Sequence, residues 1–300
     1  MSRDPSRELD DFRDALHAKA ERDAEPARKG QPAENLDRKQ DRKLPTSPLA
    51  PEPRCRDSRN VLYDHDRGYR LRQSEIRTLT DLGKFRVVGL EDLVTQVYSG
   101  HRQEMQGDLR NLLRQGLIHK GIFDGPERAP RELLTLTKAG YRLLLANRIV
   151  AKDQAIYHGF LKPRDANHDA DLYMLYQKAA ARIQAKGGRP VRVVLDLELQ
   201  SKINRDFATF GTEARKEIAA RHGLQVVGGK IPVPDLRIEY ERHDGEKARE
   251  DLELVTEHYR GPTVADKVRA GFSLYTPRGE GDRLRRVLDQ KELVAEILSL

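Results

Sequence analysis

Side chains with hydrogen-bond donors recur between residues 101 and 114. An arginine can bond the edge of a guanine or a phosphate oxygen, and a glutamine can pair with adenine. Arg102, Gln103 and Gln106 stand near the start of this stretch, where base edges are closest in a reading helix. Arg110 and Arg114 stand further along and are expected to hold the sugar–phosphate backbone. The chemistry that this spacing favours is contact with a nucleic acid.

A second group of donors follows, around a polar turn at Gly125 and Pro126. It consists of Lys120, Arg128 and Arg131. Arginines at the tip of such a hairpin follow the DNA backbone or enter the minor groove. The competing explanation for each of these residues is an ordinary solvated charge on the surface.

Hydrophobic spacing from Ser74 to Leu145 predicts the elements that position these donors. Helices are expected at 74–83, 90–98, 101–115 and 137–145, a short strand at 85–88, and a hairpin from 117–123 and 132–136. Gly83 and Gly116 stand where helices are expected to end. Together these elements predict a winged helix-turn-helix, which presents one helix and a hairpin to a duplex. Winged helices also dock proteins, so an adaptor remains an alternative.

The charge distribution agrees with DNA binding but supports it only weakly. The chain of 300 residues carries a formal net charge of +7. Residues 1–58 hold 13 basic and 13 acidic groups, residues 59–150 hold 16 and 11, and residues 151–300 hold 26 and 24. Most of the excess therefore falls in the predicted helix-turn-helix, as expected if that region meets phosphates.

Composition divides the chain into three parts. Residues 1–58 contain almost no apolar clusters and four closely spaced prolines, so we expect a disordered charged arm. Residues 59–150 form the winged-helix domain and 151–300 a second domain. The one cysteine, Cys55, excludes a disulfide within the chain. No apolar run approaches the length of about 18 residues that a membrane span needs, and no signal-peptide core is present, so we expect a cytoplasmic protein.

The second domain is predicted to be α/β. A long helix at 168–183, a strand at 190–196, helical residues at 198–222, strands at 233–240 and 251–256, and a helix at 263–275 follow in order. The tail at 283–298 is again amphipathic. This succession favours three layers, with a sheet between helices.

Part of this order resembles the PD-(D/E)XK nuclease-like core. The resemblance is carried by Pro234-Asp235, the strand bearing Glu253, and the helix from Lys267 to Tyr275. Residues 70–276 as a whole resemble the replication-relaxation family of plasmid and integrative elements. Besides the nuclease-like core, this resemblance rests on the preceding winged helix, on the segment from Leu136 to Gly140 and on His168. The resemblance implies a restriction-endonuclease-like domain behind a DNA-binding domain. It also implies a role near DNA relaxation, mobilisation or replication control.

In an active nuclease of this type two carboxylates hold a divalent metal and a lysine stabilises charge or orients water. The resemblance assigns the carboxylates to Asp235 and Glu253. The usual lysine position, two residues after Glu253, is occupied by Val255. Lys267 would have to supply the amine from the following helix, with Glu198 or Gln177 completing the site.

Because that lysine is missing, we expect a degenerate nuclease domain in a non-enzymatic DNA-binding accessory or regulatory protein of a mobile element. No cofactor is then needed. The alternative is a magnesium-dependent DNA endonuclease that uses Asp235, Glu253 and Lys267. Double-stranded DNA is the expected partner. Proteins of the mobile element and a second copy of the chain are the others considered, and no membrane is expected.

Overall fold

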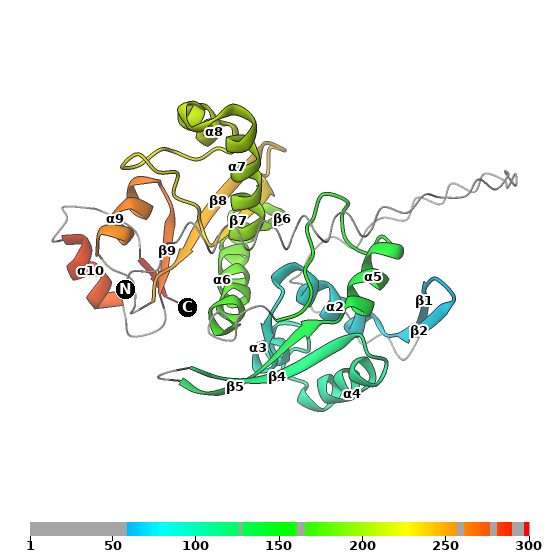
Figure 1. Ribbon diagram of the computed structural model, residues 1–300. Helices are drawn as coiled ribbons and strands as arrows, with labels where there is room; N and C mark the ends of the chain where they lie inside the picture. The colour runs from blue at the N-terminus through cyan, green and yellow to red at the C-terminus, as the bar shows by residue number, and fades with distance from the viewer. Residues whose placement is uncertain are drawn as a thin grey trace, which may run out of the picture. The chain divides into compact units, whose positions relative to one another are not determined.

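The computed structural model describes residues 59–125, 128–160, 166–256, 261–276, 281–289 and 297–299 (Figure 1). The arm predicted at residues 1–58, with Cys55, lies outside these ranges, as do Pro126 and Pro163. Within the described ranges, no helix combines the length and the apolar composition that crossing a membrane requires. The described residues form a mixed α/β structure with three small sheets.

The first part of the chain contains a two-stranded and a three-stranded sheet with four helices around them. Its elements are β1 (Asn60–Asp64), β2 (Arg67–Leu71), α2 (Gln73–Phe85), β3 (Val88–Gly89), α3 (Leu90–Gln96), α4 (Arg102–Arg114), β4 (Ile118–Gly125), β5 (Arg128–Leu136) and α5 (Lys138–Ala146). β1 and β2 form an antiparallel hairpin, and β5 lies between β3 and β4, antiparallel to both. Helices and hairpin therefore follow the order that the sequence predicts.

Several details of this part differ from the predictions. The second strand of the hairpin, expected at 132–136, begins at Arg128. The β1–β2 hairpin was not predicted. The first helix does not end at Gly83 but continues through Phe85, so the expected strand at 85–88 shrinks to β3. Gly83 is inside the helix because it packs closely: a Cβ atom there would lie 3.1 Å from Leu144 Cδ1 and 3.3 Å from Leu136 Cδ1. At this position glycine is a packing residue rather than a helix stop.

The second part is built on one mixed sheet. Its elements are α6 (Ala166–Ala185), β6 (Arg189–Leu195), α7 (Asp196–Phe210), the 3₁₀ turn η2 (Thr212–Ala214), α8 (Arg215–Arg221), β7 (Leu236–Glu241), β8 (Lys247–Leu254), α9 (Gly261–Arg269), β9 (Ser273–Thr276), α10 (Gly281–Asp289) and β10 (Ile297–Ser299). The strand order is β10-β9-β8-β7-β6. β6, β7 and β8 are antiparallel neighbours, whereas β8, β9 and β10 are parallel.

Three predicted elements of the second part were wrong in detail. The helix expected at 198–222 is interrupted at Gly211, whose φ of 77° no helix accommodates. The helix expected at 263–275 ends at Arg269; Gly271 turns the chain with a φ of 83°, and Tyr275 lies in β9. Asp235 precedes β7 rather than lying within it.

Alternation along the strands gives the sheet two different faces. One face carries the buried residues Leu236, Ile238, Leu252 and Leu254, which share a hydrophobic cluster with α6. The opposite face carries Asp235, Arg237, Asp251 and Glu253 alongside Val194 of β6, and α7 and α8 pack there through a second cluster. Asp235, Arg237, Asp251 and Glu253 therefore share one face of the sheet, opposite to the face that α6 covers.

The segment 149–160 connects the two parts and closes an open sheet edge. The side chain of Gln154 donates to the carbonyl of Val193 and accepts from its amide, both at 2.9 Å. β6 is an edge strand, so this glutamine takes the place of a neighbouring strand. Further on, the amide of Tyr157 donates to Gly83 O at 2.7 Å.

The largest hydrophobic cluster runs across the predicted boundary at residue 150, because Tyr173 of α6 packs edge-on against Phe85.

Candidate functional site

α4 has one buried and one exposed face. Met105, Leu109 and Leu112 are in the core, and the buried carboxylate of Asp108 accepts a hydrogen bond from Ser74 at the start of α2. Asn111 donates to Glu75 at 2.6 Å, which fixes the same two helices at a second point. The opposite face exposes Gln103, Gln106, Arg110 and Arg114.

The exposed donors of α4 are largely uncommitted. Arg110 makes one contact, from Nε to the backbone carbonyl of Gln106 at 3.2 Å. The side chains of Gln103 and Arg114 form no hydrogen bond or ion pair with another residue in the described part of the chain. Their amide and guanidinium groups are therefore free to meet an external partner.

Two other predicted contacts are engaged in exposed ion pairs. Arg102 at the start of α4 binds Glu91 of α3 through both of its terminal nitrogens, one of them at 2.6 Å. Lys120 of β4 lies 2.6 Å from Glu132 of β5. Exposed pairs of this kind contribute little to stability, so neither pair holds its cation strongly.

Arg131 lies elsewhere than predicted. It was expected at the hairpin tip, but it is paired with Phe123 along the ladder, and its guanidinium contacts Asp171 at 2.7 Å and Asp92 at 3.1 Å. It therefore joins α3 to α6. The side chain of Arg128 lies outside the described residues.

The structure brings the three predicted catalytic residues together. Lys267 Nζ of α9 lies 2.6 Å from Glu253 Oε1, and Glu253 Oε2 accepts from the amide of Asp235 at 3.3 Å. Asp235 Oδ2 in turn accepts from the amide of Leu254 at 2.9 Å. We call these three side chains the carboxylate–lysine cluster. Lys267 also donates to the carbonyl of Val233 at 2.8 Å.

The bonding within this cluster limits what it can do. Glu253 is fully buried, and both of its oxygens already accept a bond, one from an ammonium group. A carboxylate in that state neutralises a lysine and joins β8 to α9. Among the described residues, no three His, Cys, Asp or Glu side chains form a group that could hold a metal ion.

The two residues suggested to complete the site do not join it. Glu198 pairs with Arg192 and, at 2.6 Å, with Lys202. Gln177 is buried on α6, which packs on the other face of the sheet.

His168 is a neighbour of the cluster that sequence reasoning placed only at a helix start. Its Nε2 lies 3.7 Å from Asp235 Oδ1. Burial by itself lowers the pKa of His168, but the nearby carboxylate of Asp235, aided by Asp169 and Asp171, outweighs burial and raises this pKa to about 9. The ring is therefore an imidazolium at neutral pH, and it adds a second positive charge beside the two carboxylates.

No family model matches the chain, and no curated protein matches it. Among solved structures, Bacillus subtilis PadR in complex with operator DNA is similar to part of it. The sequences are 14% identical over 46% of this chain and 75% of the PadR chain, with a TM-score of 0.22. A TM-score this low carries no argument about fold or function.

Proposed function

We propose that the first part of the chain is a winged helix-turn-helix that binds double-stranded DNA through α4 and the β4–β5 hairpin. The observation that carries the proposal is the exposed face of α4, where Gln103, Gln106, Arg110 and Arg114 project from a helix fixed by its buried face. Arginine and glutamine are the side chains that bond phosphates and base edges. Lys120 adds a donor on the hairpin.

We propose that the second part acts without catalysis, as a degenerate nuclease-like domain of an accessory or regulatory protein of a mobile element. This proposal rests on the resemblance and on the bonding of the carboxylate–lysine cluster. With both Glu253 oxygens occupied, the cluster holds the sheet to α9 instead of presenting open oxygens. Val255, where an active enzyme has its lysine, is buried in an apolar cluster.

The test of DNA binding is a salt titration of the full chain on duplex fragments. Replacing both Arg110 and Arg114 by alanine should weaken binding to every sequence, and the slope of log K against log salt should fall by about 0.9 for every phosphate that the variant no longer neutralises. The matched control, Arg242→Ala with Lys247→Ala, removes two exposed positive charges from the β7–β8 hairpin and should leave the slope nearly unchanged. Equal behaviour of the two variants would show that α4 is not the face that binds DNA.

A metal-dependent endonuclease is the second candidate, because Asp235, Glu253 and Lys267 do converge. With Glu253 neutralised by Lys267, we expect no cleavage of supercoiled, linear or branched DNA in magnesium or manganese. Divalent-dependent nicking that disappears in both Asp235→Asn and Glu253→Gln would establish the endonuclease instead. Nicking that persists in both variants would indicate a contaminating enzyme.

A further inference from the structure

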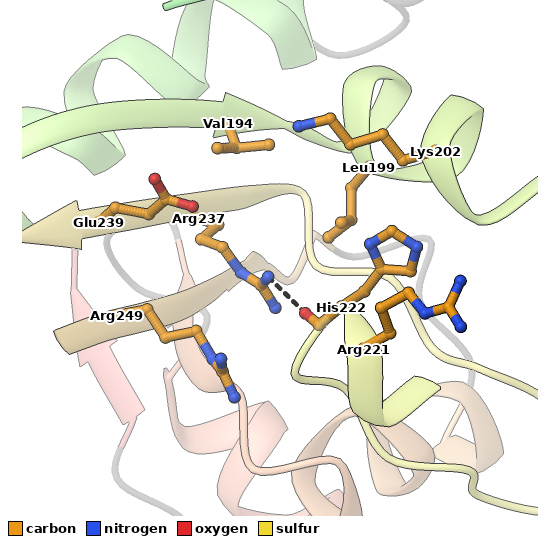
Figure 2. A pocket seen from close by; sticks show the side chains of 8 residues that line it. All are labelled: Val194, Leu199, Lys202, Arg221, His222, Arg237, Glu239 and Arg249. Atoms are coloured by element: carbon orange, nitrogen blue, oxygen red, sulfur yellow. Dashed lines mark hydrogen bonds between the residues drawn. The ribbon is translucent and has the colours of Figure 1, made fainter. Parts of the chain in front are cut away.

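A pocket of about 210 Å³ lies on the face of the five-stranded sheet that carries Arg237 (Figure 2). Its floor is formed by side chains of β6, β7 and β8, and its walls by the start of α7 and the end of α8. Five of its eight lining residues are basic, and one is acidic. They are Val194, Leu199, Lys202, Arg221, His222, Arg237, Glu239 and Arg249.

Arg237 is the fixed centre of this pocket. It is 5% exposed, and its guanidinium is held by Asp251 at 2.6 and 2.9 Å and by the carbonyl of His222 at 2.7 Å. These bonds use three of its five N–H groups, so two donors remain. Because the protein already holds the group, a ligand that binds these donors does not bear the cost of ordering the side chain.

Arg249 adds further unused donors to the floor of the pocket. It is exposed, and one of its nitrogens donates to the carbonyl of Gly223 at 2.7 Å. Figure 2 shows its side chain beside that of Arg237, on the neighbouring strand. Gly223 makes room for it, since a Cβ atom there would lie 1.9 Å from an Arg249 terminal nitrogen.

The opposite wall adds two further cations. Lys202 of α7 binds Glu198 at 2.6 Å and keeps two N–H groups free for a ligand. Arg221 of α8 lies 3.5 Å from Asp206 and stacks on the ring of Phe210 at 4.3 Å. The neighbouring carboxylates hold Lys202 and Arg221 in position, and the unused N–H groups of the pocket come from four separate elements, α7, α8, β7 and β8.

We propose that this pocket binds a phosphate group, either free or at the end of a nucleic acid. A tetrahedral oxyanion accepts several donors at once, Arg237 and Arg249 offer unused N–H groups from neighbouring strands of the pocket floor, and charge-assisted bonds to phosphate are the strong kind. Glu239 on one side of the pocket disfavours ligands with further negative charge there. The inference is independent of DNA binding by α4.

The test is calorimetric titration of the full chain with inorganic phosphate at constant ionic strength, and with a dinucleotide carrying or lacking a 5′-phosphate. We expect one phosphate per chain, and Arg249→Gln should weaken binding about tenfold or more, as expected for losing charged hydrogen bonds. Arg242→Gln, at an exposed arginine in the turn between β7 and β8, is the matched control. Thermal unfolding of each variant verifies that it folds.

Each outcome has a definite meaning. Binding of inorganic phosphate that Arg249→Gln weakens supports a site for a free phosphate group, and binding of the phosphorylated dinucleotide alone assigns the site to a nucleic-acid end. No binding of either probe, or equal weakening by the control variant, overturns the proposal. The Arg110 and Arg114 variant should bind phosphate like the parent, so the failure of one proposal is distinguishable from the failure of the other.

Discussion

Replacing Lys267 by methionine tests whether the carboxylate–lysine cluster is a structural element. Methionine keeps most of the apolar stem of the side chain but removes the ammonium group. Glu253, which is fully buried, then loses the ammonium group 2.6 Å away that balances its charge, and the carbonyl of Val233 loses its donor. A buried charge without a partner is strongly destabilising.

The expected loss of unfolding free energy is about 3–5 kcal/mol, the usual cost of removing one member of a buried ion pair. A domain of ordinary stability has about 5–15 kcal/mol in total, so the variant should be clearly less stable while a fraction remains folded. Adding Glu253→Gln should recover most of the loss, because the buried charge is then absent. The glutamine carbonyl oxygen can still accept the hydrogen bond from the amide of Asp235.

Urea unfolding of the four proteins in this double-mutant cycle measures the effect, with Lys247→Met as a control on an exposed lysine. The control should change stability by no more than about 0.5 kcal/mol. A loss below about 1 kcal/mol, or a double variant no more stable than the single one, would refute the structural role.

Three further predictions concern other parts of the chain. The pKa of His168 is raised from 6.5 to about 9, so its contribution to stability is full below pH 6.5 and is lost as the pH rises through 9. The side chain is 34% exposed, so solvent screening limits this contribution to about 1–2 kcal/mol. His168→Gln should therefore flatten the dependence of unfolding free energy on pH between 6.5 and 9. Gln154→Ala leaves the amide and carbonyl of Val193 without partners and should cost about 1–3 kcal/mol by urea unfolding, whereas an unchanged midpoint would mean that water replaces the glutamine. Deleting residues 1–58, which lack apolar groups able to pack, should leave the unfolding midpoint nearly unchanged, and a large drop would show that they dock on the rest of the chain.

The sequence determined where most helices and strands lie, because hydrophobic spacing reports a buried face directly. α4 occupies 102–114 where a helix was predicted at 101–115, and the hairpin and α5 follow as predicted. The exposure of Gln103, Gln106, Arg110 and Arg114 also followed from that spacing, since the buried positions of a helix fix which residues face outward. Two helix ends were predicted wrongly. Gly83 was expected to end a helix but lies inside α2, where it packs closely against leucine side chains. The helix expected to reach Tyr275 stops earlier, because Gly271 turns the chain.

Tertiary structure alone decided which charged residues meet. Asp235, Glu253 and Lys267 are separated in sequence, and whether their bonds leave an open site or a closed cluster depends on distances that no spacing encodes. Arg131 shows the same limit, because its partner Asp171 on α6 is 40 residues away in the sequence. The pocket around Arg237 requires β6, β7, β8 and two helices to pack before its cations become neighbours. Periodicity assigns a side chain to a face of its own element, but only the packing of distant elements chooses its partner, and the partner decides whether a charge is neutralised or available.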